Sequence, residues 1–420
     1  MMFISILILL LAPQNEPPTT VLKPAHVFDG VSRELHKDWL VAVRGEKIIA
    51  AGPASDLKIP ADAKMIELPG MTLLPGLIDA HSHLLLHPYN ETSWEDQVLK
   101  EPLALRVCRA TNHARATLLS GFTTLRDLGT EGASYADVGL KQAILQGIIP
   151  GPRLLVTTKA IVATGSYAPK GFAPEVTIPQ GAEEADGTNL VRVVRDQISH
   201  GADWIKVYAD YRWGLKNDAQ PTFSIEELKL IVDTAASSGR QVCAHATSKE
   251  GMRRATLARV ATIEHGTDGD VEVFRLMVSK NVALAPTLAT TEAMYRYRHP
   301  SWNPDKDPEP DPLKAQHTVF KAALDAGVTI ICGSDVGVFP HGTQSRELEL
   351  MARYGMPNIE VLRTVTSTNA KVLGIADQVG AVKPGLFADL IAVEGNPLAD
   401  LTTLRQVKFV MKSGKVYKQP

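Results

Sequence analysis

Residues 73–83 read LLPGLIDAHSH, an apolar run that ends in two histidines. Along the chain, similar runs alternate with segments whose apolar residues recur at helical spacing, as in consecutive βα units. These helical segments include residues 103–120, 190–200, 225–238 and 313–326. The strand-like runs are LLPGLIDAHSH, TTLRDLG, PRLLVTTKAI, WIKVYAD, QVCAHAT, ATIEHGT, VALAPTL and TIICGSD. This alternation predicts an α/β fold, a closed (β/α)8 TIM-type barrel over residues 75–374, with its active site at the C-terminal strand ends.

The segments on either side of the barrel have a different pattern. Residues 21–74 and 375–420 contain short alternating runs, such as WLVAVRGEKIIAAG and VKFVMKSGKVY, punctuated by glycine and aspartate. This pattern is typical of β-strands joined by tight turns. Because neither segment alone has enough strands to bury a core, we expect both chain ends to form one small β-sandwich domain.

The composition is that of a globular enzyme, since 45% of the 420 residues are hydrophobic and 21% are charged. The formal net charge of −2 gives no general attraction to nucleic acid, so a small-molecule substrate is expected instead. The three cysteines lie far apart without CxxC spacing, which excludes a disulfide scaffold and a cysteine-ligated zinc ribbon.

The N-terminus, MMFISILILLLAPQNEPPTT, joins an apolar run to a proline-rich polar stretch. The run at residues 3–12 is too short to span a bilayer but fits the apolar region of a signal peptide. Residues 1–20 are therefore predicted to be a signal peptide and linker that direct export to a periplasm or the medium. No Lys or Arg precedes the run, so a cytoplasmic protein is the alternative. No other segment predicts a stable membrane span.

Metal-ligand residue types follow several of the predicted strands. His81 and His83 are two residues apart on an extended chain, so both imidazoles point to the same side. His245, His265 and Asp335 each end another run. Residues of these types at the C-terminal ends of barrel strands are typical of a catalytic site. Four histidines and one aspartate at one barrel mouth predict a metal centre.

Lys206 lies inside the apolar run WIKVYAD. An unpaired lysine is costly to bury as a cation, so such a position favours its neutral amine. A neutral amine can react with carbon dioxide to give a carbamate, an anion with two oxygens. Two neighbouring divalent ions need such a bridging anion, so we expect Lys206 to be N6-carboxylysine.

These residues resemble the amidohydrolase superfamily in its two-metal form with a carboxylated lysine. The resemblance runs from LPGLIDAHSH through IEHG and GSD to KPGLFADLIAVEGNPL, nearly the whole chain. It implies that His81, His83 and Asp335 hold the more buried ion. It implies that His245 and His265 hold the second, with carboxylated Lys206 and a hydroxide as bridges. Zn²⁺ suits these ligands, and Co²⁺ or Mn²⁺ would also fit.

Within the superfamily, the chain is most similar to the Xaa-Pro dipeptidase-like and imidazolonepropionase-like group. That group includes Xaa-Arg and Xaa-Lys dipeptidases, N-acyl amino acid hydrolases and hydrolases of ochratoxin A, an N-acyl phenylalanine. The resemblance implies hydrolysis of the amide bond of a dipeptide or N-acyl amino acid by the bridging hydroxide, releasing a C-terminal amino acid. It also implies that Asp335 carries the proton to the leaving nitrogen, that Tyr208 hydrogen-bonds the substrate carbonyl, and that the chain forms a homo-oligomer.

The substrate carboxylate needs a cation at the barrel mouth. Candidates are Arg212, His341 in GVFPHGT and Lys170 in GSYAPKGF, and His87 is a candidate pocket residue near the metal motif. A lactam, hydantoin or other cyclic amide is the alternative substrate, because its hydrolysis uses the same metal site. Deaminases of this fold place a glutamate soon after the fifth-strand histidine, whereas this chain has HATSKEG. An inactive scaffold would lose metal ligands, and this chain keeps all six.

Overall fold

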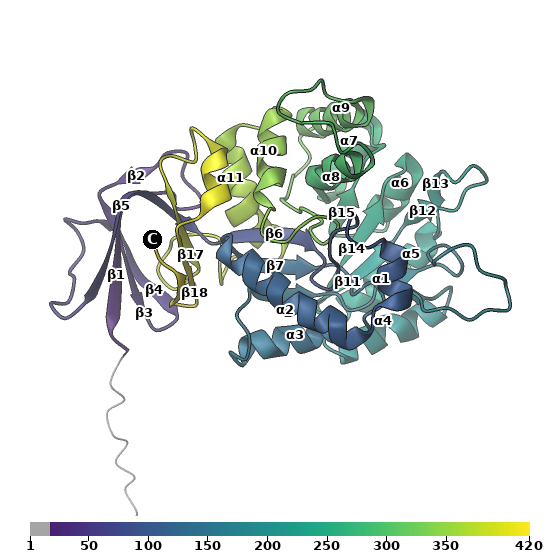
Figure 1. The fold of residues 1–420 in the computed structure, drawn as a ribbon, viewed down its shortest axis with the longest axis horizontal. Coiled ribbons are helices and arrows are strands. Elements are labelled where there is room, and N and C mark those ends of the chain that lie inside the picture. The colour runs from purple at the N-terminus through teal and green to yellow at the C-terminus, as the bar shows by residue number, and fades with distance from the viewer. Residues whose placement is uncertain (1–16) are drawn as a thin grey trace, which may run out of the picture.

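The computed structural model describes residues 17–420, so the apolar run at residues 3–12 lies outside the described residues. Strands from both chain ends form one sheet at one side of the molecule (Figure 1). Its hydrogen-bonded order is β19-β18-β17-β5-β1-β3-β4, with β2 paired to β1. These strands are β1 (Thr19–Val27), β2 (His36–Lys37), β3 (Trp39–Arg44), β4 (Lys47–Pro53), β5 (Lys64–Pro75), β17 (Leu390–Glu394), β18 (Phe409–Lys412) and β19 (Lys415–Lys418).

Strand β5 connects this sheet to the barrel. Its C-terminal half pairs antiparallel with β17, and only Gly76 separates it from β6, the first barrel strand. Alternate residues such as Leu22, Val41, Leu73 and Phe409 form a buried apolar cluster of their own. The sheet therefore has its own core, as expected for an added β domain.

Parallel strands make up the barrel wall. They are β6 (Leu77–Ser82), β7 (Phe122–Asp127), β8 (Arg153–Val156), β9 (Ile161–Val162), β11 (Trp204–Tyr208), β14 (Gln241–Ala246), β15 (Thr262–His265) and β16 (Ala283–Ala285). One sheet contains β6-β7-β8, and a second contains β9-β11-β14-β15-β16, with β10 (Glu183–Glu184) at its edge. The backbone N–H of Asp203 donates to Val156 O at 2.8 Å, which joins the two sheets.

The last barrel segment differs from the regular strand predicted for TIICGSD. It pairs only through the bridges Leu284↔Ile330 and Ser82↔Val336. Asp335, with φ +61°, leaves the extended conformation between them. Backbone hydrogen bonds still close the ring, from Ile331 N to Leu284 O and from Asp335 N to His81 O. The predicted fold class, an α/β barrel with an added β domain, is confirmed.

Helices cover the outside of the barrel, and the predicted helical segments agree with them to within a few residues. In α5 the side chains of Leu228, Ile231 and Ala235 are buried at helical spacing. Ser224 and Glu227 close its N-terminus as a capping box. The helices are α1 (Trp94–Lys100), α2 (Leu103–Leu119), α3 (Ala136–Leu145), α4 (Asn189–Ser199), α5 (Ile225–Ala236), α6 (Lys249–Leu257), α7 (Val271–Lys280), α8 (Leu288–Arg298), α9 (Asp311–Asp325), α10 (Ser345–Arg353), α11 (Asn358–Arg363) and α12 (Asn369–Val372).

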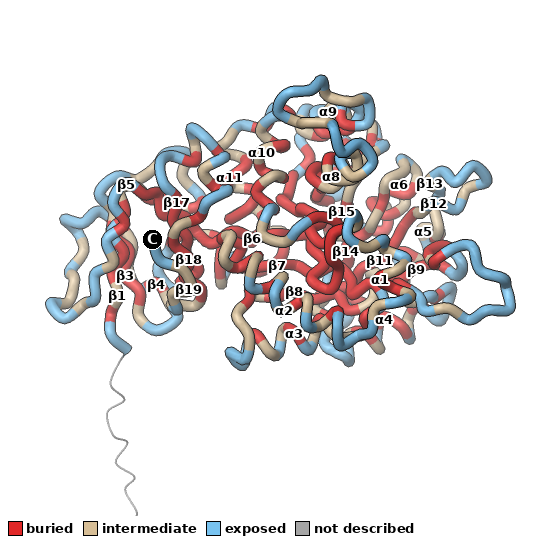
Figure 2. The backbone as a smooth tube through the Cα atoms, viewed as in Figure 1, coloured by how far each residue is buried: buried red, intermediate tan, exposed pale blue. Residues whose placement is uncertain are grey.

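Burial is greatest along the barrel strands (Figure 2). The barrel interior is unusual because charged side chains are buried there, including Arg126 and Lys206. Burying a charge is expensive unless it is paired, so such positions are commonly functional. In residues 17–420, none of the helices is both long and apolar enough to cross a bilayer.

Candidate active site

The C-terminal end of β6 and the segment after Ile331 bring three ligand-type side chains together. Nε2 of His81 lies 3.4 Å from Oδ1 of Asp335, and Nε2 of His83 lies 3.3 Å from the same oxygen. One ligand atom from each residue lies within 4.8 Å of the other two, and all three residues are buried. Two imidazole nitrogens and a carboxylate in this arrangement can hold one divalent cation.

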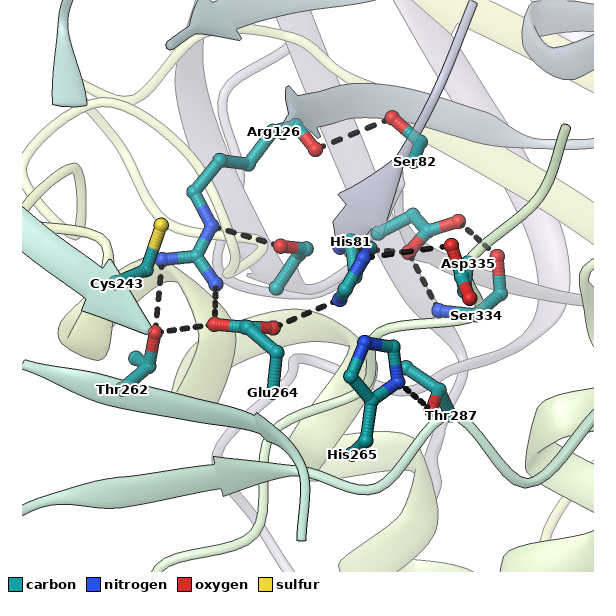
Figure 3. A network of polar contacts seen from close by, with 12 residues as sticks. His81, Ser82, Arg126, Cys243, Thr262, Glu264, His265, Thr287, Ser334 and Asp335 are labelled. Atoms are coloured by element: carbon teal, nitrogen blue, oxygen red, sulfur yellow. Dashed lines mark hydrogen bonds and ion pairs between the residues drawn. The ribbon is translucent and has the colours of Figure 1, made fainter. Parts of the chain in front are cut away.

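Hydrogen bonds fix the orientation of His81. Its Nδ1 lies 2.9 Å from Oε2 of Glu264 on β15, which leaves Nε2 facing Asp335. The other carboxylate oxygen of Glu264 accepts from Arg126 at 2.8 Å and from the hydroxyl of Thr262. Figure 3 shows Glu264 between Arg126 and His81. A carboxylate behind a ligating histidine holds its ring and raises the basicity of the other nitrogen.

His83 and His265 are held in a similar way. Nδ1 of His83 lies 3.0 Å from the backbone oxygen of Gly129, which can only accept, so this nitrogen carries the proton. Nε2 of His83 is therefore the ring nitrogen that faces Asp335, 3.3 Å from its Oδ1. Nδ1 of His265 lies 2.8 Å from the hydroxyl of Thr287, which likewise leaves Nε2 available. These contacts prepare the imidazoles to bind metal through Nε2.

His245 extends the cluster to four imidazoles. Its ring centroid lies 4.6 Å from that of His265, which lies 5.0 Å from that of His81. The His245 ring also stacks on Tyr208 with a centroid distance of 4.5 Å. The structure thus brings together all four histidines predicted from the strand ends, next to Asp335.

Lys206 lies on β11, next in the sheet to β14, which carries His245. Its side chain is 1% exposed, and its Nζ lies 5.4 Å from the centroid of the Tyr208 ring. Among residues 17–420, no carboxylate lies within 4.0 Å of this nitrogen. A buried amine without a carboxylate partner, beside a group of histidines, fits the expected carbamate position.

The electrostatics of the site favour an ionised Asp335. Burial alone raises the pKa of Asp335, but nearby His81 and the hydrogen bond from His83 outweigh it, so the pKa lies well below its usual range. Burial lowers the pKa of His83, but the bond to Asp335 reverses this and raises it to about 9. Burial lowers the pKa of His265 to about 4. Asp335 and His265 also have φ values of +61° and +76°, and such strained backbone is common at functional sites.

A pocket of about 480 Å³ opens over this cluster. Tyr208 lies in its wall, and Arg212, at the end of β12 (Asp210–Arg212), lines it as well. Lys170 does not line it, but its Nζ donates to the backbone oxygen of Arg212 at 3.2 Å and to Asn217 Oδ1 at 3.4 Å. Strand β12, which ends at Arg212, pairs antiparallel with β13 (Ala219–Pro221).

The two remaining candidates lie outside the lining of this pocket. The ring nitrogens of His87 lie 3.1 Å from a Glu91 oxygen and 2.9 Å from a Glu101 oxygen. The His341 ring stacks on His113 with a centroid distance of 4.3 Å, and its Nε2 lies 3.3 Å from Leu86 O. The structure therefore does not bring His87 or His341 together with the metal-ligand cluster in one cavity.

Sequence reasoning missed two carboxylates of the site. Glu264 lies within the IEHG motif, but its inward position behind His81 is visible only in the closed barrel. Glu131 lines the pocket from the loop after β7. Its position two residues after the end of the barrel run TTLRDLG is the signal that could have found it.

The fold and the site define the class of protein. Residues 72–417 match the amidohydrolase family, and this chain belongs to that family. It is a hydrolase that acts on amide bonds. Members of the family bind divalent metal ions, and the buried group of His81, His83 and Asp335 fits such an ion.

Particular relatives place the chain in one part of the family. It is 29% identical to the ochratoxinase of Aspergillus niger, over 98% of this chain and 89% of the relative. The crystal structure of that enzyme superimposes with a TM-score of 0.80 over 97% of each chain. A crystal structure of a Xaa-Pro dipeptidase with bound methionine has 30% identity and a TM-score of 0.82, covering 95% of this chain and all of the other. The imidazolonepropionase of Chloroflexus aggregans is 25% identical over 89% of this chain and 88% of its own. The predicted family group is confirmed.

Proposed function

We propose that this enzyme hydrolyses the amide bond of a dipeptide or an N-acyl amino acid and releases the C-terminal amino acid. The observation that carries the proposal is the buried group of His81, His83 and Asp335 beneath a pocket of about 480 Å³. That space suits a substrate of two residues. The names of the relatives support the same chemistry, because one is an ochratoxinase and another a Xaa-Pro dipeptidase. Ochratoxin A-type N-acyl phenylalanines are within the proposed class.

The six predicted ligands would hold two divalent ions, with Zn²⁺ as the proposed metal. His81, His83 and Asp335 would bind the first, and His245 and His265 the second. Lys206, as N6-carboxylysine, would join the two sites, and its unpaired, buried position supports this role. Bound divalent ions lower the pKa of water and polarise a carbonyl, which is the chemistry that amide hydrolysis needs.

Two residues of the chain have proposed roles in the reaction itself. Asp335 accepts a proton from the attacking water at a carboxylate oxygen and passes it to the leaving nitrogen. The hydroxyl of Tyr208 would leave Oε1 of Glu131, 3.4 Å away, and donate to the oxygen of the scissile carbonyl. The buried ring of Tyr208 is fixed by stacking on His245, which supports a defined position for that hydroxyl.

Arg212 is the proposed partner of the substrate's C-terminal carboxylate. It is the one Arg or Lys among the described residues that line the pocket. Lys170 donates to the backbone oxygen of Arg212 and to the side chain of Asn217, so its proposed role is to hold this loop and add positive charge nearby. An Arg guanidinium can bind a carboxylate through two parallel hydrogen bonds, which also orients the substrate.

Hydrolysis of a substrate panel tests this proposal. The panel contains dipeptides, N-acyl amino acids including ochratoxin A, and cyclic amides such as lactams and hydantoins. The proposal predicts release of a free C-terminal amino acid from at least one linear substrate, and loss of that activity in Asp335→Asn. Opening of a cyclic amide without cleavage of any linear one would contradict it and support the alternative substrate class.

A further inference from the structure

Glu131 is a pocket residue to which the proposed reaction gives no role. It lies in the loop after β7, lines the pocket and is only 2% exposed. Its φ is +49°, in the left-handed region that non-glycine residues seldom adopt. Arg106 stabilises this conformation, because its NH1 donates to the backbone oxygen of Glu131 at 2.7 Å. The chain thus holds a carboxylate in the pocket at some cost in backbone strain.

The donors around this carboxylate are all neutral. Oε2 accepts from the hydroxyl of Tyr167 at 2.5 Å and from Nε1 of Trp94 at 2.9 Å. The hydroxyl of Tyr208 donates to Oε1 at 3.4 Å. In residues 17–420, the Glu131 carboxylate forms no ion pair within 4.0 Å with a Lys, Arg or His. The nearby guanidinium of Arg106 donates to backbone oxygens of Leu85, Thr130 and Glu131 rather than to this carboxylate.

Aromatic rings surround the same corner of the pocket. The centroid of Tyr167 lies 4.9 Å from that of Trp94, 4.7 Å from that of Tyr208 and 4.8 Å from that of Tyr211. All four rings line the pocket together with Glu131. The faces of aromatic rings carry partial negative charge and attract cations, most strongly where water is excluded. A buried carboxylate among such rings makes this corner attractive to a cation and unfavourable for an anion.

We propose that Glu131 and the rings of Trp94, Tyr167, Tyr208 and Tyr211 form a subsite for a cationic group of the substrate, an alkylammonium or a guanidinium. This inference rests on the proposed function, because the cation belongs to the amide substrate of the same pocket. Two sources share this chemistry, the free α-ammonium of a dipeptide and a basic side chain. Arg212, which also lines the pocket, then binds the substrate carboxylate. The cationic group and the carboxylate of the substrate thus each meet a residue of opposite charge.

Matched substrates separate the two sources. Alanyl-norleucine differs from propionyl-norleucine only by the α-ammonium, and propionyl-lysine differs from propionyl-norleucine only by the side-chain ammonium. The wild-type enzyme should prefer at least one of the cationic partners in kcat/KM by about tenfold, an effect of the size expected for a desolvated cation on aromatic faces and a carboxylate. A preference for alanyl-norleucine would identify the α-ammonium as the bound cation, and a preference for propionyl-lysine would identify the basic side chain.

The variant Glu131→Gln keeps the shape of the side chain and removes its charge. It should abolish the preference for the cationic partner, mainly through KM, because it lowers kcat/KM for that partner more than kcat/KM for propionyl-norleucine. Asp268→Asn is the matched control, since it neutralises an exposed carboxylate that lines the same pocket and should leave the preference unchanged. An equal loss on all three substrates would show that Glu131 only holds Tyr208 and Tyr167, and would overturn the proposal. Loss of the preference in Asp268→Asn alone would overturn it as well.

Binding distinguishes this proposal from the proposed function. In metal-loaded enzyme, alaninamide should raise the melting temperature more than propionamide, or lysine more than norleucine, and Glu131→Gln should remove the difference. This comparison does not need turnover. If no linear amide is cleaved but the difference is present, the proposed function fails and the cation subsite stands. If the neutral partners of both pairs bind as well as the cationic ones, the subsite is disproved whatever the turnover.

Discussion

Oε2 of Glu264 lies 2.9 Å from Nδ1 of His81, and both side chains are fully buried in the barrel. The ring of His81 is thereby fixed, with Nε2 directed to Asp335. Arg126 holds the other oxygen of Glu264 at 2.8 Å, so the carboxylate itself cannot turn away. The geometry of the candidate metal site is therefore set by residues that do not bind the metal.

Replacing Glu264 by Gln should weaken metal binding. The substitution keeps the size of the side chain, but it removes the charge that supports His81 and pairs with Arg126. Loss of such a partner typically lowers metal affinity by about 10- to 100-fold. Competition with a chromogenic chelator measures this directly. Glu67→Gln, an equal charge change at an exposed site on β5, is the control and should keep wild-type affinity. Unchanged affinity in Glu264→Gln would show that the contact does not tune the site.

Lys206→Ala tests the carbamate. Without the bridging anion, the enzyme should lose most of its activity and part of its metal, because the two ions then repel each other without compensation. A short carboxylate such as acetate or propionate, added at millimolar concentration, should restore part of the rate. Metal analysis and the rate on a cleaved substrate follow both effects. Full metal content and full rate in this variant would refute the carbamate.

Asp335→Asn separates proton transfer from metal binding. The amide oxygen can still bind a cation, but the side chain no longer accepts a proton. We expect kcat to fall by about 100- to 10,000-fold, the usual contribution of a general base, while much of the metal is retained. Metal content and kcat are measured on the same preparation. A variant that keeps a rate close to wild type would assign the proton transfer to another group.

The positions of the candidate metal ligands were predictable because each of these residues lies in or directly after an apolar run that forms part of the barrel. Parallel strands of a barrel end on one side, so ligands as distant in sequence as His81 and Asp335 must converge. The helix expected at residues 103–120 is α2, Leu103–Leu119, because its periodicity is a local property. The contacts of a loop residue, in contrast, depend on distant parts of the chain. The path of the loop after β6 pairs His87 with Glu91 and Glu101, and no pattern around His87 encodes that.

The buried contacts of Glu264 and Glu131 were not predictable from the sequence either. The contact of Glu264 with His81 spans 183 positions of the chain and exists only after the barrel closes. The pairing of Glu131 with Trp94 and Tyr167 likewise requires the loop after β7, helix α1 and the loop after β9 to meet at the barrel mouth.

Export through residues 1–20 and assembly into a homo-oligomer stay predictions.

Glu347 gives a pH dependence of the protein's stability. Its carboxylate accepts from the backbone N–H groups of Leu288 and Ala289 at the start of α8, which carries pocket residues. Burial raises the pKa of Glu347 from 4.5 to about 8 in the folded protein. Between these two values the folded state holds a proton that the unfolded state has lost, so this group makes stability fall as pH rises through the interval.

Glu347→Gln should remove that slope. The difference in urea-unfolding midpoint between variant and wild type should therefore move in favour of the variant from about pH 5 to about pH 8. Taking the difference cancels the titration of groups that do not interact with Glu347. A difference that stays constant with pH would show that Glu347 titrates in the folded protein as it does in the unfolded chain.

Metal content tests the central claim most directly. Protein produced with zinc and bicarbonate, freed of loosely bound ions and analysed by plasma mass spectrometry, should contain about two Zn²⁺ per chain, the stoichiometry of a bridged two-metal hydrolase. A content of about one ion per chain, or none, in protein that is folded would contradict the bridged site and the chemistry proposed for it.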